Sequence, residues 1–219
     1  MTQSKPLFTL LKYLGMNLMW FVMTFPIFIV LITFDYVQNI GEVLTNLLLL
    51  IPLIAFLLFP ASTALLGVIK QEREATEKVD SLNTFFSQYK KHYWASLKGG
   101  LVFSIALTSV FFVLYYFTLQ RQLILSFIAF ALFLILTMLA LYFLVLTTIY
   151  KASVWDKLKA AFNLISNHKK HSLIFISLVT VISLLSVTFL RFLIPTFYGS
   201  LIGFITYYLT KDRVNTLTE

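Results

Sequence analysis

Long apolar runs separated by short polar and basic stretches make up most of this chain. A helix needs roughly 20 mostly apolar residues to cross a bilayer. Because backbone amides in lipid must be bonded within their own segment, each run is expected to be helical. The pattern predicts an all-α integral membrane protein with six transmembrane helices, at about residues 14–34, 44–69, 97–119, 122–150, 172–190 and 194–210.

The last two of these spans depend on how one long run is divided. Residues 172–210 are apolar over about twice the length of a single crossing, with Arg191 and Pro195 inside. Two short spans leave Lys211 and Arg213 in the cytoplasm, whereas a single crossing exports them. The charge distribution therefore favours two spans.

The basic residues also predict the orientation. Fifteen of the 17 Lys and Arg residues fall in four stretches that alternate with the apolar runs, namely the N-terminus, residues 70–98, residues 151–171 and the C-terminus. Cytoplasmic loops retain Lys and Arg, and exported loops lack them. We therefore expect both termini in the cytoplasm.

Both longer cytoplasmic connections have the pattern of amphipathic helices, at about residues 81–96 and 154–166. Their apolar residues recur at intervals of three and four, and Ser153 with Asp156 fits an S-x-x-D helix start. Such helices lie in the interface, with aromatic side chains toward acyl chains and lysines toward headgroups. The candidate headgroup contacts are Lys90, Lys91, Trp94, Trp155, Lys157, Lys169 and Lys170.

The two connections end in similar sequences. Residues 86–92 read F-S-Q-Y-K-K-H and residues 165–171 read I-S-N-H-K-K-H, each leading into a span. A parallel internal repeat explains the similarity, and so does interface chemistry shared by two unrelated segments.

Composition excludes several classes of protein. Apolar residues make up 59% of the chain and charged residues 12%, against roughly 25% charged in soluble domains. The net charge of +8 indicates contact with anionic lipid, because nucleic-acid binding needs a solvated basic face that the chain lacks. Without cysteine there is no disulfide or thiolate metal site.

Four segments resemble the YesL-like family of bacterial membrane proteins of unknown function. They read N-L-M-W-F-V-M-T-F-P (17–26), F-P-A-S-T-A-L-L-G-V-I-K (59–70), N-T-F-F-S-Q-Y-K-K-H-Y-W-A-S (83–96) and P-T-F-Y-G-S-L-I-G-F-I-T-Y-Y-L (195–209). Where that family typically has a Gly-rich charged turn, residues 71–79 are acidic and lack Gly. The resemblance implies a multi-helix protein of the bacterial inner membrane, often encoded near carbohydrate-uptake and breakdown genes. It supplies no catalytic residues.

The second span contains the best candidate for a functional element, comprising Pro60, Ser62, Thr63 and Gly67. Proline removes a backbone donor and frees a carbonyl one turn earlier. The small residues allow helices to approach closely, and the two hydroxyls can bond across helices. A transporter could bind substrate at such a break, but we favour a packing kink, since Pro and Gly are frequent in membrane helices.

Ionisable side chains are missing from the centres of the predicted spans. Their absence counts against proton relays, ion-coupled transport and intramembrane catalysis. Asn17 and Asn46 lie near span ends, where we expect hydrogen bonds to neighbouring residues. The acidic-basic residues 72–80 contain no phosphate-binding motif and are interpreted as a solvated loop.

His168 and His171 have a spacing that a metal could use, but the adjacent lysines repel cations. We therefore expect no catalytic residues, cofactor site or metal site, and no enzymatic activity.

Two functions remain. The first is a non-catalytic accessory or scaffold protein, linked to carbohydrate uptake, whose partners are anionic lipid headgroups and a transporter or other membrane protein. The alternative is a small permease or channel for a sugar or other small solute. Its polar path would be formed by Ser62, Thr63, Ser104, Thr108, Thr147 and Thr148. Arg191 would either receive an anionic solute at the outer mouth or cap the turn between the last two spans.

Overall fold

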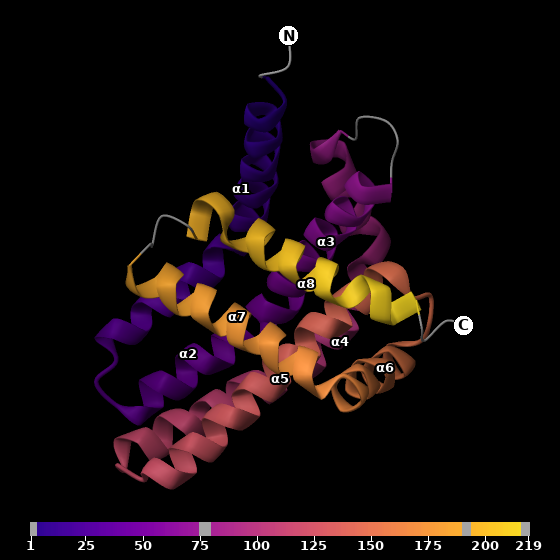
Figure 1. Cartoon of the computed structure of the whole chain (residues 1–219). Helices are drawn as coiled ribbons and strands as arrows, with labels where there is room; N and C mark the ends of the chain where they lie inside the picture. The colour runs from indigo at the N-terminus through magenta and orange to yellow at the C-terminus, as the bar shows by residue number, and fades with distance from the viewer. Residues whose placement is uncertain (1–3, 75–79, 190–193, 216–219) are drawn as a thin grey trace.

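The structure is a computed structural model that describes residues 4–74, 80–189 and 194–215 (Figure 1). Regular secondary structure within these residues is entirely helical, as predicted. In chain order the elements are α1 (Ser4–Thr33), η1 (Phe34–Tyr36), α2 (Ile40–Leu53), η2 (Ile54–Leu58), α3 (Phe59–Glu74), α4 (Ser81–Leu119), α5 (Leu123–Ile149), α6 (Val154–Asn167), α7 (Lys169–Thr188), η3 (Ile194–Tyr198) and α8 (Gly199–Asn215).

Five helices in the described part of the chain are long and apolar enough to cross a membrane. They are Lys12–Tyr36, Ile40–Glu74, Ser81–Leu119, Leu123–Ile149 and Lys169–Ser186. These helices are compatible with a multi-pass membrane protein and correspond to the first five predicted spans. The sixth predicted span corresponds to η3 and α8, which are not among the five.

The fold differs from prediction at residues 81–96, which are not a separate interfacial helix. They begin the continuous α4, whose 39 residues extend roughly 58 Å at about 1.5 Å per residue. Since the hydrocarbon core is about 30 Å thick, one end of α4 extends beyond it. Within residues 81–96, Phe85 and Gln88 are buried, whereas Phe86 and Trp94 are exposed.

Residues 154–166 do form a separate helix, α6, with the predicted start. Ser153 Oγ accepts a hydrogen bond from Asp156 N at 3.2 Å, and Ser153 Oγ donates to Asp156 Oδ2 at 2.6 Å. This arrangement satisfies an amide that the first helical turn leaves open. The two K-K-H segments differ in structure: residues 86–92 lie inside α4, whereas residues 165–171 cross the break at His168 between α6 and α7.

The two π-helical segments, η2 and η3, lie beside or at prolines. In η2, directly before Pro60, Phe59 N bonds to Ile54 O, which is the wider π-helical spacing. Proline cannot donate an amide to the preceding turn, and a π-type turn accommodates the disruption without ending the helix. Pro195 lies within η3, the second such turn. The helix therefore continues past Pro60, with a π-helical turn just before it.

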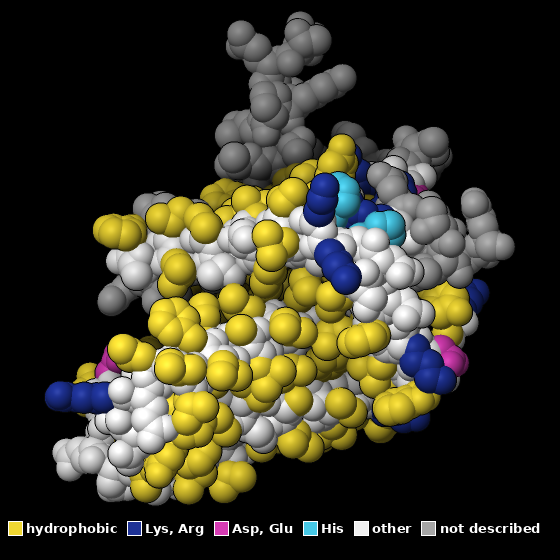
Figure 2. All heavy atoms as spheres, turned by 60° about the horizontal axis from the view of Figure 1, so that its bottom comes forward, with side chains coloured by type: hydrophobic (Ala, Val, Ile, Leu, Met, Phe, Trp, Pro, Cys, Tyr) yellow, Lys and Arg dark blue, Asp and Glu magenta, His cyan; other side chains and the backbone are white. Residues whose placement is uncertain are grey.

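The helices pack with their connections at two ends of the bundle (Figure 1). The α1–α2 connection and the α4–α5 turn lie together at the lower left, whereas the N-terminus, α6 and the C-terminus lie away from them. Figure 2 shows a broad hydrophobic face, with most Lys, Arg and His side chains gathered toward one end of it. The largest buried cluster joins α1, α3, α4, α5 and α8, and includes Met16, Phe59, Phe103, Phe143 and Tyr207.

Candidate functional site

The small residues after Pro60 bring α3 into close contact with its neighbours. A Cβ atom on Gly67 would lie 2.9 Å from Gln88 Cγ of α4, so a larger residue there would require the Gln88 side chain to shift. Ser96 Oγ donates to Thr63 Oγ1 at 2.9 Å, and Trp20 Nε1 donates to Ser62 Oγ at 3.0 Å. Ser62 and Thr63 thus each take part in a hydrogen bond between helices.

Asn17 connects α1 to the irregular segment η3. Its Nδ2 donates to Ile194 O at 3.1 Å and to Pro195 O at 2.8 Å, and its Oδ1 accepts from Ser200 N at 3.0 Å. The side chain is fully buried. Asn17 thus supplies partners for backbone groups that a regular helix would satisfy itself, which confirms the expectation that this residue bonds to its neighbours.

A partly open cavity of about 400 Å³ lies among α1, η2, α3, α4, α5, α7, η3 and α8. Ser62 and Trp20, which hydrogen-bond each other, form part of its wall. Most of the remaining wall is apolar, and none of the described lining residues is Asp, Glu, Lys, Arg or His. Representative apolar lining residues are Ile27, Phe28, Leu66, Leu107, Ala140, Leu144, Val179 and Ile202.

The hydroxyl groups in the wall are mostly directed to partners within the protein. Thr137 donates to Phe133 O at 2.8 Å, and Thr206 donates to Ile202 O at 2.6 Å. Ser183 bonds with the Tyr198 hydroxyl at 2.9 Å. Because these groups already have hydrogen-bond partners, the cavity presents a surface better matched to an apolar group than to a sugar.

The polar path considered for a permease is not assembled. Of its six residues only Ser62 lines the cavity. Thr63 bonds to Ser96, and the other four hydroxyls donate to carbonyls of their own helices over 2.7–3.1 Å. The sequence of each span does not show which way its hydroxyl groups point. It therefore could not exclude such a path.

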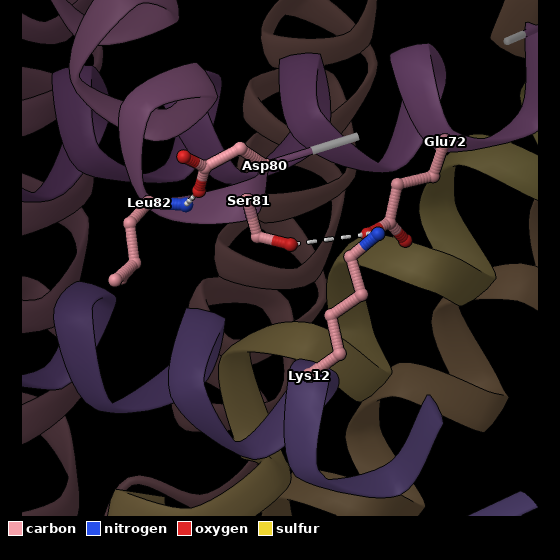
Figure 3. Close-up of polar contacts among 5 residues, drawn as sticks. All are labelled: Lys12, Glu72, Asp80, Ser81 and Leu82. Carbon is pink, nitrogen blue, oxygen red and sulfur yellow. Dashed lines mark hydrogen bonds and ion pairs between the residues drawn. The ribbon is translucent and has the colours of Figure 1, made fainter. Parts of the chain in front are cut away.

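An ion pair at the ends of α1, α3 and α4 was missed at the sequence level (Figure 3). Lys12 Nζ lies 2.6 Å from Glu72 Oε1, and Ser81 Oγ donates to the same oxygen at 3.4 Å. Asp80 caps α4 by accepting from Leu82 N at 3.2 Å. The interpretation of residues 72–80 as a solvated loop is wrong for residues 72–74, which belong to α3, whereas Asp80 is exposed and precedes α4. The feature that the prediction overlooked is that α3 continues as a helix beyond its apolar residues, to Glu74.

The candidate headgroup contacts divide into two groups. Lys90, Lys91, Lys169 and Lys170 are exposed, and Trp94 and Trp155 are 71% and 66% exposed. In contrast, only 5% of Lys157 is exposed. Lys157 therefore does not match the predicted contact with lipid headgroups. It lies on the face of α6 that packs against the rest of the protein. Arg191 lies outside the described residues.

Comparison with known proteins gives one match. A family model described as "Protein of unknown function, DUF624" matches residues 13–116, somewhat less than half of the chain. YesL-like proteins carry this domain, so the match supports the resemblance as far as an uncharacterised family. The matched residues run from α1 through most of α4 and include Asn17, Trp20, Pro60 and Ser62. No curated protein and no solved structure matches the chain.

Proposed function

We propose that this protein is a non-catalytic accessory protein of a bacterial inner membrane that holds a lipid acyl chain in its central cavity. The observation that carries the proposal is the cavity of about 400 Å³ with a largely apolar wall. An acyl chain suits such a wall because it makes dispersion contacts there and leaves no polar group without a partner. The link to carbohydrate uptake and a membrane-protein partner rests on the family resemblance.

We further propose six spans with both termini in the cytoplasm. The five apolar helices and the separation of connections in Figure 1 support this arrangement. In it, the exposed Lys90, Lys91, Lys169 and Lys170 face anionic headgroups, each contributing about 1 kcal/mol. Trp94 and Trp155 lie at the interface, where amphipathic aromatic rings are favoured.

Photocrosslinking tests whether the cavity holds an acyl chain. The purified protein is reconstituted with a phospholipid that carries a diazirine in its acyl chain, and the crosslinked peptides are mapped. We expect crosslinks at lining residues such as Leu107 and Ile202, in addition to those on the outer surface.

A pair of variants on α5 separates cavity binding from surface contact. Ala140→Phe fills the cavity and should abolish crosslinks to its wall, because Ala140 lines it. Ile135→Phe adds a ring at a 47% exposed position outside the wall and should leave them unchanged. Crosslinks confined to the outer surface of the unaltered protein would contradict the proposal.

The π-helical turn beside the cavity favours a second candidate, a permease. Helix interruptions that line a cavity are used by transporters to bind solutes, and Leu58 of η2 lines this cavity. Uptake of labelled sugars into liposomes containing the purified protein distinguishes the two functions. Uptake that Ala140→Phe blocks would favour the permease, whereas no uptake across a broad panel would exclude it.

A further inference from the structure

One hydroxyl group in the cavity wall differs from the others. Ser62 Oγ accepts a hydrogen bond from Trp20 Nε1 at 3.0 Å, and the indole N–H can only donate. No described residue accepts a hydrogen bond from the Ser62 hydroxyl in return. Because Ser62 lines the cavity, its hydroxyl proton is available to a molecule bound there.

The other hydroxyl groups of the described wall donate their protons within the protein. Four of them donate to carbonyls of their own helices over 2.6–2.8 Å, namely Thr24, Thr137, Ser186 and Thr206. Ser183 donates to Val179 O at 2.7 Å. The Tyr198 hydroxyl, 2.9 Å from Ser183 Oγ, is then the donor of the bond between these two groups. Ser62 thus provides the one unused O–H donor among the described lining residues.

The rest of the wall restricts the kind of acceptor that can meet this donor. A carboxylate or a phosphate would be left without a counter-charge, because no described lining residue is Lys, Arg or His. Ser62 also precedes Lys70 by eight residues, about 12 Å of helix, and lies within the apolar part of α3. A neutral oxygen on an otherwise apolar molecule satisfies both conditions.

We propose that the cavity holds the ester end of an acyl chain, and that the ester carbonyl oxygen accepts a hydrogen bond from Ser62. The inference rests on the proposed function and adds which part of the lipid is recognised. An ester suits this wall because it carries an acceptor but no O–H of its own, unlike an alcohol or a protonated acid. A phospholipid and an uncharged acylglycerol both supply such an ester.

The contribution of the carbonyl is measured with paired photocrosslinking lipids. Both members of a pair carry the same diazirine-bearing chain, joined to glycerol by an ester in one and by an ether, which lacks the carbonyl, in the other. One pair is a phosphatidylglycerol, and the other is a diacylglycerol with its dialkyl counterpart. The full-length protein is reconstituted with each lipid at the same mole fraction. Crosslinks to Leu107 and Ile202 of the wall are quantified relative to those on the outer surface.

We expect the ester member of at least one pair to crosslink to the wall about two- to tenfold more than its ether counterpart, as for one net hydrogen bond. The pair that shows the preference identifies the source of the ester. Ser62→Ala should remove the preference and leave the ether crosslinks unchanged. Ser186→Ala is the matched control and should keep the preference, because the Ser186 hydroxyl lines the wall but donates to Ile182 O.

The possible failures separate this inference from the proposed function. Equal wall crosslinking by the ester and ether members of both pairs would overturn the inference and leave acyl-chain binding standing. Absence of wall crosslinks from every lipid would contradict both proposals. Retention of the preference in Ser62→Ala, or its equal loss in Ser186→Ala, would exclude Ser62 as the donor. If Ser62→Ala fails to fold, Ser62→Cys, which substitutes a weaker donor, should lower the preference instead.

Discussion

At the scale of single residues, the side chains that matter most are polar groups placed inside an apolar bundle. An unpaired backbone amide or carbonyl in such surroundings costs about 1–3 kcal/mol. The Asn17 side chain forms hydrogen bonds with three backbone groups, two in η3 and one in α8. The sequence indicates that this side chain can form hydrogen bonds. It does not identify the partners, because they lie more than 170 residues away along the chain.

Replacing Asn17 with leucine should destabilise the protein by about 2–3 kcal/mol, because three backbone partners lose their bonds. Unfolding of the purified protein by increasing SDS in mixed micelles measures the change. Asn46→Leu is the matched control. Asn46 is half-buried and forms no side-chain hydrogen bond with the described residues, so little change is expected. Equal effects of the two substitutions would show that the bridge to η3 contributes nothing.

At the scale of elements, glycines determine how closely the helices pack. A Cβ atom on Gly99 of α4 would lie 2.1 Å from Phe143 Cε1 of α5, within the hairpin that these helices form. Gly67 similarly allows Gln88 of α4 to lie against α3. Within α4, Phe85 and Gln88 are buried, whereas Trp94 is exposed. Periodicity indicates an amphipathic helix, but the neighbouring helix selects the buried stripe.

Gly99→Ala should therefore destabilise the α4–α5 pair by about 1–3 kcal/mol, the usual cost of overpacking. Gly15→Ala is the control in α1, where an added Cβ meets no atom within 4 Å. Alanine should stabilise that helix by about 0.5–1 kcal/mol. Thermal unfolding of the two purified variants provides the comparison, and a stabilising Gly99→Ala would mean that Phe143 moves aside readily.

At the scale of the whole molecule, the distribution of charge agrees with the arrangement of the helices. The basic and histidine side chains gather toward one end of the hydrophobic face in Figure 2. The exposed basic residues of α4 and α7 belong to this pattern, whereas Arg121 lies in the turn between α4 and α5. The proposed orientation places the first group inside the cell and Arg121 outside.

Cysteine labelling tests that orientation cleanly, because the chain contains no cysteine. In intact cells a membrane-impermeant maleimide should label Arg121→Cys. It should label Lys90→Cys and Lys169→Cys only after the membrane is permeabilised. Labelling of either lysine position from outside would invert the proposed topology and remove the cytoplasmic headgroup contacts with it.

The amino-acid order alone determined the helical class, the first five apolar helices, the helix start at Ser153 and the irregular turn near Pro60. These features depend on hydrophobic length, capping and the missing proline donor, all of which act over a few neighbouring residues. Tertiary structure decided the rest: the continuity and buried face of α4, the pairing of Lys12 with Glu72, the burial of Lys157 and the central cavity. Each of these arises from contacts between helices distant in sequence, and the same helical periodicity is compatible with several such packings.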